Sequence, residues 1–228
     1  MNKKMTNSKV MIIGGGVTGL AAAVSLDTMG IDSVIIEKNA ELGGKVKEYS
    51  KVFPDFRSGK AIVRELVEKV GQSSRIKTSV STSVTAVDRS NGSYTVLTSD
   101  HHRYNVKAII LTCGFEVFDA LLQEEYGYGV YPNVVNSLEL ESMLGNEVKE
   151  SGMLVRPSDG KPATRMAIIF CVGSRSKRLG NPYCSRICCS YSTKQAIEIM
   201  EKNPEASVTC FYMDIRTYDR GFEEMYQY

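Results

Sequence analysis

Hydrophobic and polar positions divide the chain into short apolar runs separated by longer mixed stretches. Five runs of strand length carry mostly apolar residues: Val10–Ile13, Ser33–Ile36, Ala108–Leu111, Met166–Phe170 and Ser207–Met213. Short apolar runs next to turn residues are typical of buried strands. Residues 93–98 instead alternate between polar and apolar side chains, which predicts a strand of an antiparallel excursion.

The stretches between these runs predict four helices: Leu20–Met29, Lys60–Val70, Ser137–Leu144 and Ser190–Lys202. The order strand, turn, helix, strand therefore occurs near the start of the chain and again near its end. This order predicts an α/β fold that contains two βαβ units. We expect a nucleotide-binding domain with a connector at residues 1–150, and a partial second unit at residues 151–228.

The first strand leads directly into a glycine-rich turn, Gly14-x-Gly16-x-x-Gly19, which opens the first helix. In a dinucleotide-binding turn the first glycine permits the tight bend, and the second lets the backbone approach a pyrophosphate. The third glycine allows helix and strand to pack closely, and the helix N-terminus offers free N–H groups to the anion. Glu37 ends the second strand, about 20 residues further on, where an acidic residue meets the ribose hydroxyls. The alternative is a glycine-rich turn without a ligand.

Composition and charge narrow the classes of function. The 228 residues are 43% hydrophobic and 24% charged with a net charge of +2, as in an ordinary globular protein. No segment is dense in Lys and Arg with interleaved aromatics, so we expect no nucleic-acid partner. The N-terminal apolar run is too short for a signal peptide or a transmembrane segment, and we expect a cytoplasmic protein.

Four of the six cysteines fall in one window of the second unit: Cys171, Cys184, Cys188 and Cys189. In a reducing compartment, clustered cysteines are more often metal ligands or redox groups than disulfides. Adjacent Cys188 and Cys189 do not form a zinc knuckle, whereas an iron-sulfur cluster presents separate iron corners to neighbouring thiolates. These residues favour a cluster and leave zinc and unliganded thiols as alternatives.

The same window differs from a nicotinamide-binding turn. After Phe170 the chain has Gly173 but no third glycine at the required spacing, and the turn is lengthened. We therefore expect that cysteines replace the phosphate cradle. Four basic residues accompany them, and they either offset the charge of a cluster or form a solvated loop: Arg175, Lys177, Arg178 and Arg186.

Two further motifs carry a resemblance to known flavoproteins. Leu42-Gly43-Gly44-Lys45, just after Glu37, resembles the two-dinucleotide-binding flavoproteins, which bind FAD; the glycine spacing alone would also allow NAD. Thr112-Cys113-Gly114, after the strand at residues 108–111, is similar to their Ala-Thr-Gly-like turn. The resemblance implies a Rossmann-like FAD-binding domain.

The second half resembles the A-subunit family of the heterodisulfide reductases, which includes quinone-modifying oxidoreductase relatives. Six segments carry this resemblance: residues 125–134, 156–160, 171–175, 181–189, 194–196 and 213–216. The resemblance implies that the chain holds FAD and a [4Fe–4S] cluster and serves electron transfer within a larger complex, as an oxidoreductase without its own acid, base or nucleophile. Implied partners are the other subunits of such a complex; ferredoxin and a hydrogenase or dehydrogenase subunit are further candidates.

The resemblance also implies the ligand residues. The FAD contacts carry over to these positions: Gly14, Gly16, Gly19, Glu37, Lys38, Gly43, Gly44, Thr112 and Gly114. The cluster ligands carry over to Cys171, Cys184, Cys188 and Cys189. Full members of that family continue well beyond residue 228. We therefore expect a truncated form, and the alternative function is a non-catalytic fragment or assembly module that needs a second polypeptide to complete the FAD site.

Overall fold

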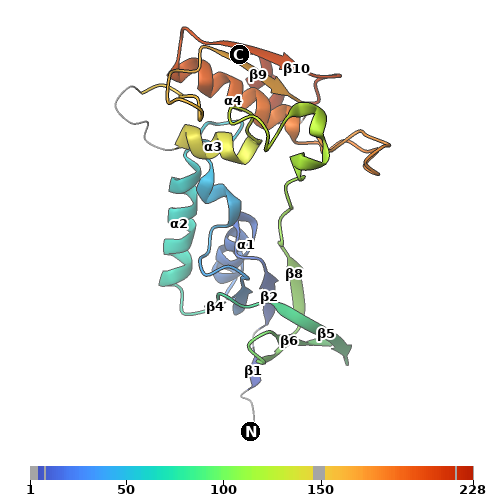
Figure 1. The fold of residues 1–228 in the computed structure, drawn as a ribbon. Coiled ribbons are helices and arrows are strands. Elements are labelled where there is room, and N and C mark those ends of the chain that lie inside the picture. The colour runs from blue at the N-terminus through green and yellow to red at the C-terminus, as the bar shows by residue number, and fades with distance from the viewer. Residues whose placement is uncertain (1–4, 8, 146–151, 219, 228) are drawn as a thin grey trace. The chain divides into compact units, whose positions relative to one another are not determined.

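The structure is a computed structural model that describes residues 5–7, 9–145, 152–218 and 220–227 (Figure 1). The chain divides into two compact units, and each unit is assembled from separate segments of the sequence. The first unit comprises residues 1–47 and 60–115, and the second comprises residues 48–59 and 116–228. The predicted boundary between residues 150 and 151 lies outside the described residues.

A four-stranded parallel sheet forms the centre of the first unit, in the order β4-β3-β2-β8. Its strands are β2 (Val10–Ile13), β3 (Ser33–Ile36), β4 (Ile76–Ser79) and β8 (Ala108–Leu111). Helices α1 (Val17–Thr28) and α2 (Gly59–Gln72) accompany it. The parallel order places the carboxyl ends of β2, β3 and β8 at one edge of the sheet, where the glycine turn, Glu37 and Thr112 come directly after these strands.

A second sheet in this unit has the order β1-β7-β6-β5 and contains antiparallel pairs. Its strands are β1 (Met5–Asn7), β5 (Val84–Ser90), β6 (Ser93–Thr98) and β7 (Arg103–Val106). The two sheets share a buried core, in which Met11, Val34 and Ile36 pack with Val96 and Val106. On the opposite face of the parallel sheet, alternate residues of β2 and β3 pack against α1 and α2.

Coverage on both faces explains the continuous apolar runs of β2 and β3. Parallel strands that are buried on both sides have no solvent-facing position, so they lose the alternation seen in β6. The core on the helical side joins Ile12 and Ile35 of the sheet to Leu20 and Ala23 of α1 and Val70 of α2. This packing fixes the start of α1 against the end of β2.

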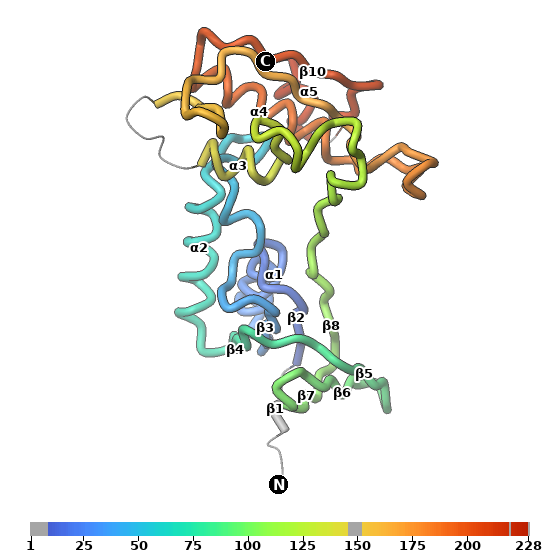
Figure 2. The backbone as a smooth tube through the Cα atoms, in the orientation of Figure 1, coloured from blue at the N-terminus to red at the C-terminus, as the bar shows by residue number. Residues whose placement is uncertain are grey.

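The second unit contains a parallel pair of strands, β9 (Arg165–Ile169) and β10 (Ser207–Phe211), joined by helix α4 (Cys188–Lys202). Its other helices are α3 (Ser137–Gly145), α5 (Phe222–Gln227) and the short turns η2 (Ala120–Leu122) and η3 (Glu124–Tyr126); a further turn, η1, spans Gly44–Glu48. Leu144, Leu154 and Ile199 are buried together, with Met166 and Val208 packed against them. Figure 2 shows the orange segment between β9 and α4 extending away from the rest of the unit.

All five predicted strands and all four predicted helices are present, and an α/β fold is confirmed. Of the strands predicted to be buried, β2 and β3 are buried, whereas β8, β9 and β10 are partly exposed. Helix α4 begins at Cys188 rather than at the predicted Ser190, so two cysteines lie in its first turn. Sequence analysis did not identify β1, β4, β5, β7 or α5. No helix in the described part of the chain is long and apolar enough to cross a membrane.

Candidate functional site

The glycine turn after β2 leaves no room for side chains at its first and third glycines. Gly14 has φ +110°, and a Cβ there would lie 2.2 Å from the carbonyl oxygen of Thr112. A Cβ on Gly19 would lie 2.0 Å from the carbonyl oxygen of Gly14. Both distances are far below contact distance, so these positions require glycine, as the fingerprint predicts.

Gly16 and the second glycine pair lie side by side. Gly16 forms a parallel bridge with Gly43, and the Gly43 N–H donates to the Gly15 carbonyl at 2.8 Å. The nearest atom to a Cβ on Gly16 would be the Gly44 Cα at 3.9 Å, so space remains beside this glycine. The N-cap of α1 is Gly16, and α1 has no side-chain cap there among the described residues. The residues present therefore fit a pyrophosphate at this helix N-terminus.

Glu37 is 5% exposed and its carboxylate contacts the glycine turn. Oε2 accepts a hydrogen bond from the Gly15 N–H at 2.7 Å, and Oε1 accepts one from the Asn39 N–H at 2.8 Å. The structure thus places the predicted acid beside the turn. Lys38, in contrast, is exposed to solvent.

The turn after β8 closes the same edge of the sheet. The Thr112 hydroxyl lies 3.0 Å from the Ile13 carbonyl and 2.8 Å from the Gly14 carbonyl, to either of which it can donate. Cys113 is exposed, and Gly114 has φ +72° with open space around it. The predicted FAD contacts other than Lys38 are thus gathered around the ends of β2, β3 and β8; their role as FAD contacts stays a prediction.

In the second unit the cysteine window occupies the long loop after β9 and the first turn of α4. Cys171, Cys188 and Cys189 are buried and pack together with Phe170. Cys184 lies on the loop before the helix and is half-buried, and its Sγ accepts a hydrogen bond from the Arg186 N–H at 3.3 Å. Cys171 and Arg186 have φ values of +61° and +62°, so the loop holds strained backbone beside its cysteines.

The pKa values of Cys171 and Cys189 are raised, partly because the other thiols lie close to them. Burial, followed by the charge of Cys188, raises the pKa of Cys171 to about 11. Burial also raises the pKa of Cys189, and the charges of Cys188 and Cys184 add to this effect. At neutral pH the metal-free site therefore holds Cys171 and Cys189 as neutral thiols, and a metal would have to displace their protons.

Arginines and one carboxylate border these thiols. The guanidinium groups of Arg175 and Arg216 both donate to Asp214, and hydrogen bonding to Arg216 is the main reason that the pKa of Asp214 is lowered. Arg175 also lowers the pKa of Cys171, opposing burial. Cys189 Sγ lies 3.8 Å from the Asp214 carbonyl oxygen. The positive charge near the thiols is thus held in place by Asp214.

The one glycine of this loop near β9 does not cradle a phosphate. A Cβ on Gly173 would lie 2.1 Å from the Phe118 ring, and the Gly173 N–H donates to the Gln123 side chain at 2.7 Å. Residues of the connector therefore occupy the space beside this turn. Because Phe118 and Gln123 fill it, a dinucleotide would have to displace them.

Sequence analysis missed a buried charged network between α3 and α4. Lys194, which is 1% exposed, pairs with Glu141 and lies 3.0 Å from Glu198 Oε1. Gln195 donates to Glu141 at 2.7 Å. Neither oxygen of Glu198 has a hydrogen-bond partner among the described residues. The helical spacing of Lys194 and Glu198 signals an ion pair, but the sequence gives no sign that it is buried.

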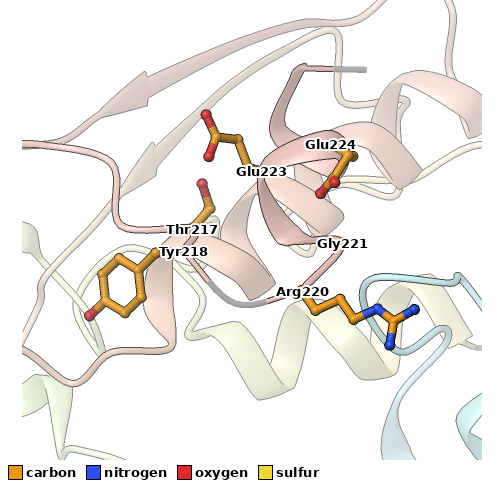
Figure 3. A pocket seen from close by; sticks show the side chains of 6 residues that line it. All are labelled: Thr217, Tyr218, Arg220, Gly221, Glu223 and Glu224. Carbon is orange, nitrogen blue, oxygen red and sulfur yellow. The ribbon is translucent and has the colours of Figure 1, made fainter.

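Two surface hollows lie in the second unit. Figure 3 shows the polar one, lined by Thr217, Tyr218, Arg220, Gly221, Glu223 and Glu224. The other is mainly apolar and is bordered by α4, β10 and α5. Neither contains the cysteines proposed as metal ligands. Among the described residues, no three His, Cys, Asp or Glu side chains are arranged to hold a metal ion. The thiols therefore fit a cluster in donor chemistry, while a ligating arrangement is not formed.

Comparison with known proteins agrees with the site in the first unit. The sequence pattern of the pyridine nucleotide-disulphide oxidoreductase family matches residues 1–133. The thioredoxin reductase of Lactococcus lactis is similar in structure, with a TM-score of 0.57 and 14% identity, over 95% of this chain and 60% of that one. The fold is therefore that of a flavoprotein oxidoreductase, as predicted.

Two relatives confirm the predicted resemblance to the A subunits of heterodisulfide reductases. The second iron-sulfur A subunit of the CoB–CoM heterodisulfide reductase of Methanopyrus kandleri is 30% identical over 96% of this chain and 45% of its own length. The A subunit of the H(2)/formate:CoB–CoM heterodisulfide,ferredoxin reductase of Methanococcus maripaludis is 48% identical over 122 residues, 54% of this chain and 18% of its own length.

The chain thus spans less than half the length of these two relatives. The family match covers more than half of the chain itself, including the glycine turn, Glu37 and the turn after β8. Together with the geometry at the ends of β2, β3 and β8, this match establishes the family. The chain belongs to the pyridine nucleotide-disulphide oxidoreductase family.

Proposed function

We propose that this chain is a flavin- and iron-sulfur-dependent electron-transfer subunit of a heterodisulfide reductase-like complex, passing electrons between FAD and a [4Fe–4S] cluster. The observation that carries the proposal is the gathering of four cysteines at the second strand–loop–helix unit, on a chain whose first unit keeps a dinucleotide-binding turn. The name of the Methanopyrus kandleri relative, an iron-sulfur subunit, supports it.

FAD would lie against the turn at Gly14, Gly16 and Gly19. The space beside Gly16 admits the pyrophosphate, and the uncapped N–H groups of α1 would receive its charge. The Glu37 carboxylate, already oriented by the Gly15 and Asn39 N–H groups, would accept hydrogen bonds from the ribose. When bound, FAD supplies exchange of electrons in pairs.

Cys171, Cys184, Cys188 and Cys189 would hold the cluster, which supplies single-electron exchange when bound. All four must lose their protons on ligation, and because burial raises the pKa of Cys171 to about 11, a metal bound at neutral pH would have to displace its proton. Arg175 offsets part of the resulting negative charge. The N-terminus of α4, which no described side chain caps, also favours thiolate charge at Cys188 and Cys189.

The remaining residues serve as a scaffold in this proposal. None has to act as an acid, base or nucleophile, because electron transfer needs position and potential rather than proton transfer. The buried Lys194 pair with Glu141 ties α4 to α3. Partners would be further subunits of a heterodisulfide reductase-like complex, and we expect them in the cytoplasm.

Anaerobic purification tests this proposal. Flavin, iron and sulfide are quantified per chain, and an EPR spectrum is recorded after dithionite reduction. We expect about one FAD, four irons and four sulfides per chain, with the EPR signal of a reduced [4Fe–4S] cluster. Bound zinc, or a chain without flavin and iron after reconstitution with both, would contradict the proposal.

A further inference from the structure

The basic residues of the cysteine loop fall into two sets with different surroundings. Arg175 is half-buried beside the thiols, since its guanidinium is fixed by Asp214, whose carbonyl oxygen lies 3.8 Å from Cys189 Sγ. Lys177, Arg178 and Arg186 form an outer set whose side chains are exposed. Balancing the charge of the thiolates accounts for Arg175 but does not account for this outer set.

The outer set carries more positive charge than its neighbours neutralise. Arg178 pairs with Glu125 on the surface, and the Arg186 guanidinium lies 5.7 Å from the centre of the Tyr218 ring. The ammonium of Lys177 has no ion-pair partner in the part of the chain that the structure describes. The whole chain has 28 basic and 26 acidic residues, so this excess is local.

Large apolar and aromatic side chains are exposed beside these charges. Tyr183 is 64% exposed, Tyr218 is 54% exposed and Ile187 is 41% exposed. Arg and Tyr are enriched at the centres of protein interfaces, where an aromatic ring supplies contact area and a polar tip. Exposed tyrosines between unneutralised cations are therefore better explained by a protein partner than by a solvated loop alone.

Cys184 places this surface next to the proposed cluster. It lies on the same loop, between Tyr183 and Arg186, and is half-buried while the other three proposed ligands are buried. The Arg186 N–H donates to its sulfur. A protein bound to the loop would therefore lie close to the most accessible of the four thiols.

Resting on the function proposed above, we propose that residues 177–187 together with Tyr218 form a docking surface for an acidic electron-transfer protein. We call it the basic loop surface. A bound acidic protein would pass one electron to the cluster that Cys171, Cys184, Cys188 and Cys189 would hold, so that its own centre is oxidised by one electron and the cluster is reduced by one. The step forms and breaks no covalent bond. The interface would be small and transient, as in other redox encounters, and its attraction would weaken with salt.

The test uses the full chain, purified anaerobically with its cluster, and a photochemically reduced plant-type [2Fe–2S] ferredoxin as an acidic probe. Stopped-flow absorbance gives the second-order rate constant for electron transfer. We expect the rate constant to fall at least about tenfold between low and high salt, as for steered association. The methyl viologen radical cation, a positively charged one-electron donor of low potential, should not show this fall with salt.

Variants locate the surface. The double variant Lys177→Glu/Arg178→Glu should lower the low-salt rate constant about tenfold and flatten its salt dependence, with iron content and EPR spectrum unchanged. Lys161 is an exposed lysine in the same unit but outside the loop. Lys161→Glu reverses one charge there and should leave the rate constant unchanged. A wild-type rate in the double variant would overturn the proposal, and so would salt-dependent binding of anionic vesicles with no binding of the ferredoxin.

Failure of the proposed function gives a different result. If the purified chain contains no iron, the cluster proposal fails. Binding of the oxidised ferredoxin, measured by calorimetry at low salt, then tests the docking surface by itself. Binding that the double variant abolishes and Lys161→Glu retains would support the surface; no binding by the wild-type chain would overturn it.

Discussion

The two strand–loop–helix units of this chain have the same order of elements and differ in the segment that joins strand to helix. In the first, β2 passes through a tight glycine turn into α1, and the turn needs glycine because the backbones of Gly14, Gly19 and Thr112 nearly touch. In the second, β9 passes through a long loop of left-handed residues and cysteines into α4. The same scaffold thus presents backbone N–H groups in one unit and thiols in the other.

The helix ends in the two units share one property. Neither α1 nor α4 has a side-chain cap among the described residues, and neither has an acidic residue in its first turn. An uncapped helix N-terminus favours negative charge. A pyrophosphate would meet this need in the first unit, and the thiolates of Cys188 and Cys189 would meet it in the second. The two helix N-termini would therefore attract negative charge for the same reason, and they would differ only in the group that carries it.

Removing one cysteine should separate the two units most completely. We expect Cys184→Ser to lose nearly all bound iron and sulfide while its FAD content stays at the wild-type level, because a [4Fe–4S] cluster needs four protein ligands. Iron, sulfide and flavin analysis of one anaerobic preparation measures this. Cys113→Ser, at an exposed cysteine of the first unit, is the matched control and should keep both cofactors. If Cys184→Ser also lost its FAD, the flavin site and the cluster site would not be independent.

The support of α4 can be broken without touching a cysteine. Lys194→Met leaves the buried carboxylates of Glu141 and Glu198 without their cation. We expect a loss of about 3–5 kcal/mol in the free energy of unfolding, measured by urea denaturation. Replacing both glutamates by glutamine in the same chain should restore most of it. Lys202→Met, in the last turn of the same helix, is the control. An equal loss of unfolding free energy in Lys202→Met would show that the buried ion pairs do not cause the effect.

The tight glycine turn of the first unit has no room for a side chain at Gly19. Gly19→Ala would place a Cβ 2.0 Å from the Gly14 carbonyl oxygen, so the turn must shift away from its ligand. We expect FAD affinity to fall about a hundredfold, about 2.7 kcal/mol, in a fluorescence titration. Gly71→Ala, in α2 with open space around it, should leave FAD affinity unchanged and slightly raise stability. Unchanged FAD affinity in Gly19→Ala would place the flavin elsewhere.

The smallest expected effect concerns charge beside the thiols. Asp214→Asn removes the carboxylate that holds Arg175 and Arg216. Because a negative charge near the cluster is lost, we expect its reduction potential to rise by some tens of millivolts, with iron content unchanged. An EPR-monitored redox titration measures this shift. Asp159→Asn, at an exposed carboxylate that pairs with Arg156, is the control, and a similar shift there would rule out a local effect.

Sequence patterns predicted the first unit well because its determinants are local. The glycines, Glu37 and the buried strands each follow from short spacings, and the structure places them around one edge of a parallel sheet. The strands β5 and β7 were missed because most of their residues are exposed or alternate with exposed ones, which gives no long apolar run. Lys38, predicted from the resemblance as an FAD contact, is exposed, and its contact with FAD stays a prediction.

The second unit was predicted less completely because its determinants are distant in sequence. Gly173 contacts Phe118 and Gln123, and Lys194 pairs with Glu141, in each case about fifty residues away. Such contacts leave no periodic signal. The start of α4 was placed two residues late, since its first turn contains cysteines instead of a capping residue. A cluster site at these cysteines stays a prediction, and only folding brings Cys171 next to Cys188.

We propose that one chain holds a flavin in its first unit and a cluster in its second. An anaerobic reductive titration tests it most directly, with dithionite added stepwise and absorbance and EPR recorded on the same sample. We expect the chain to take up about three electrons, two by the flavin and one by the cluster. Uptake of two electrons without an EPR signal from iron, or of none, would contradict it.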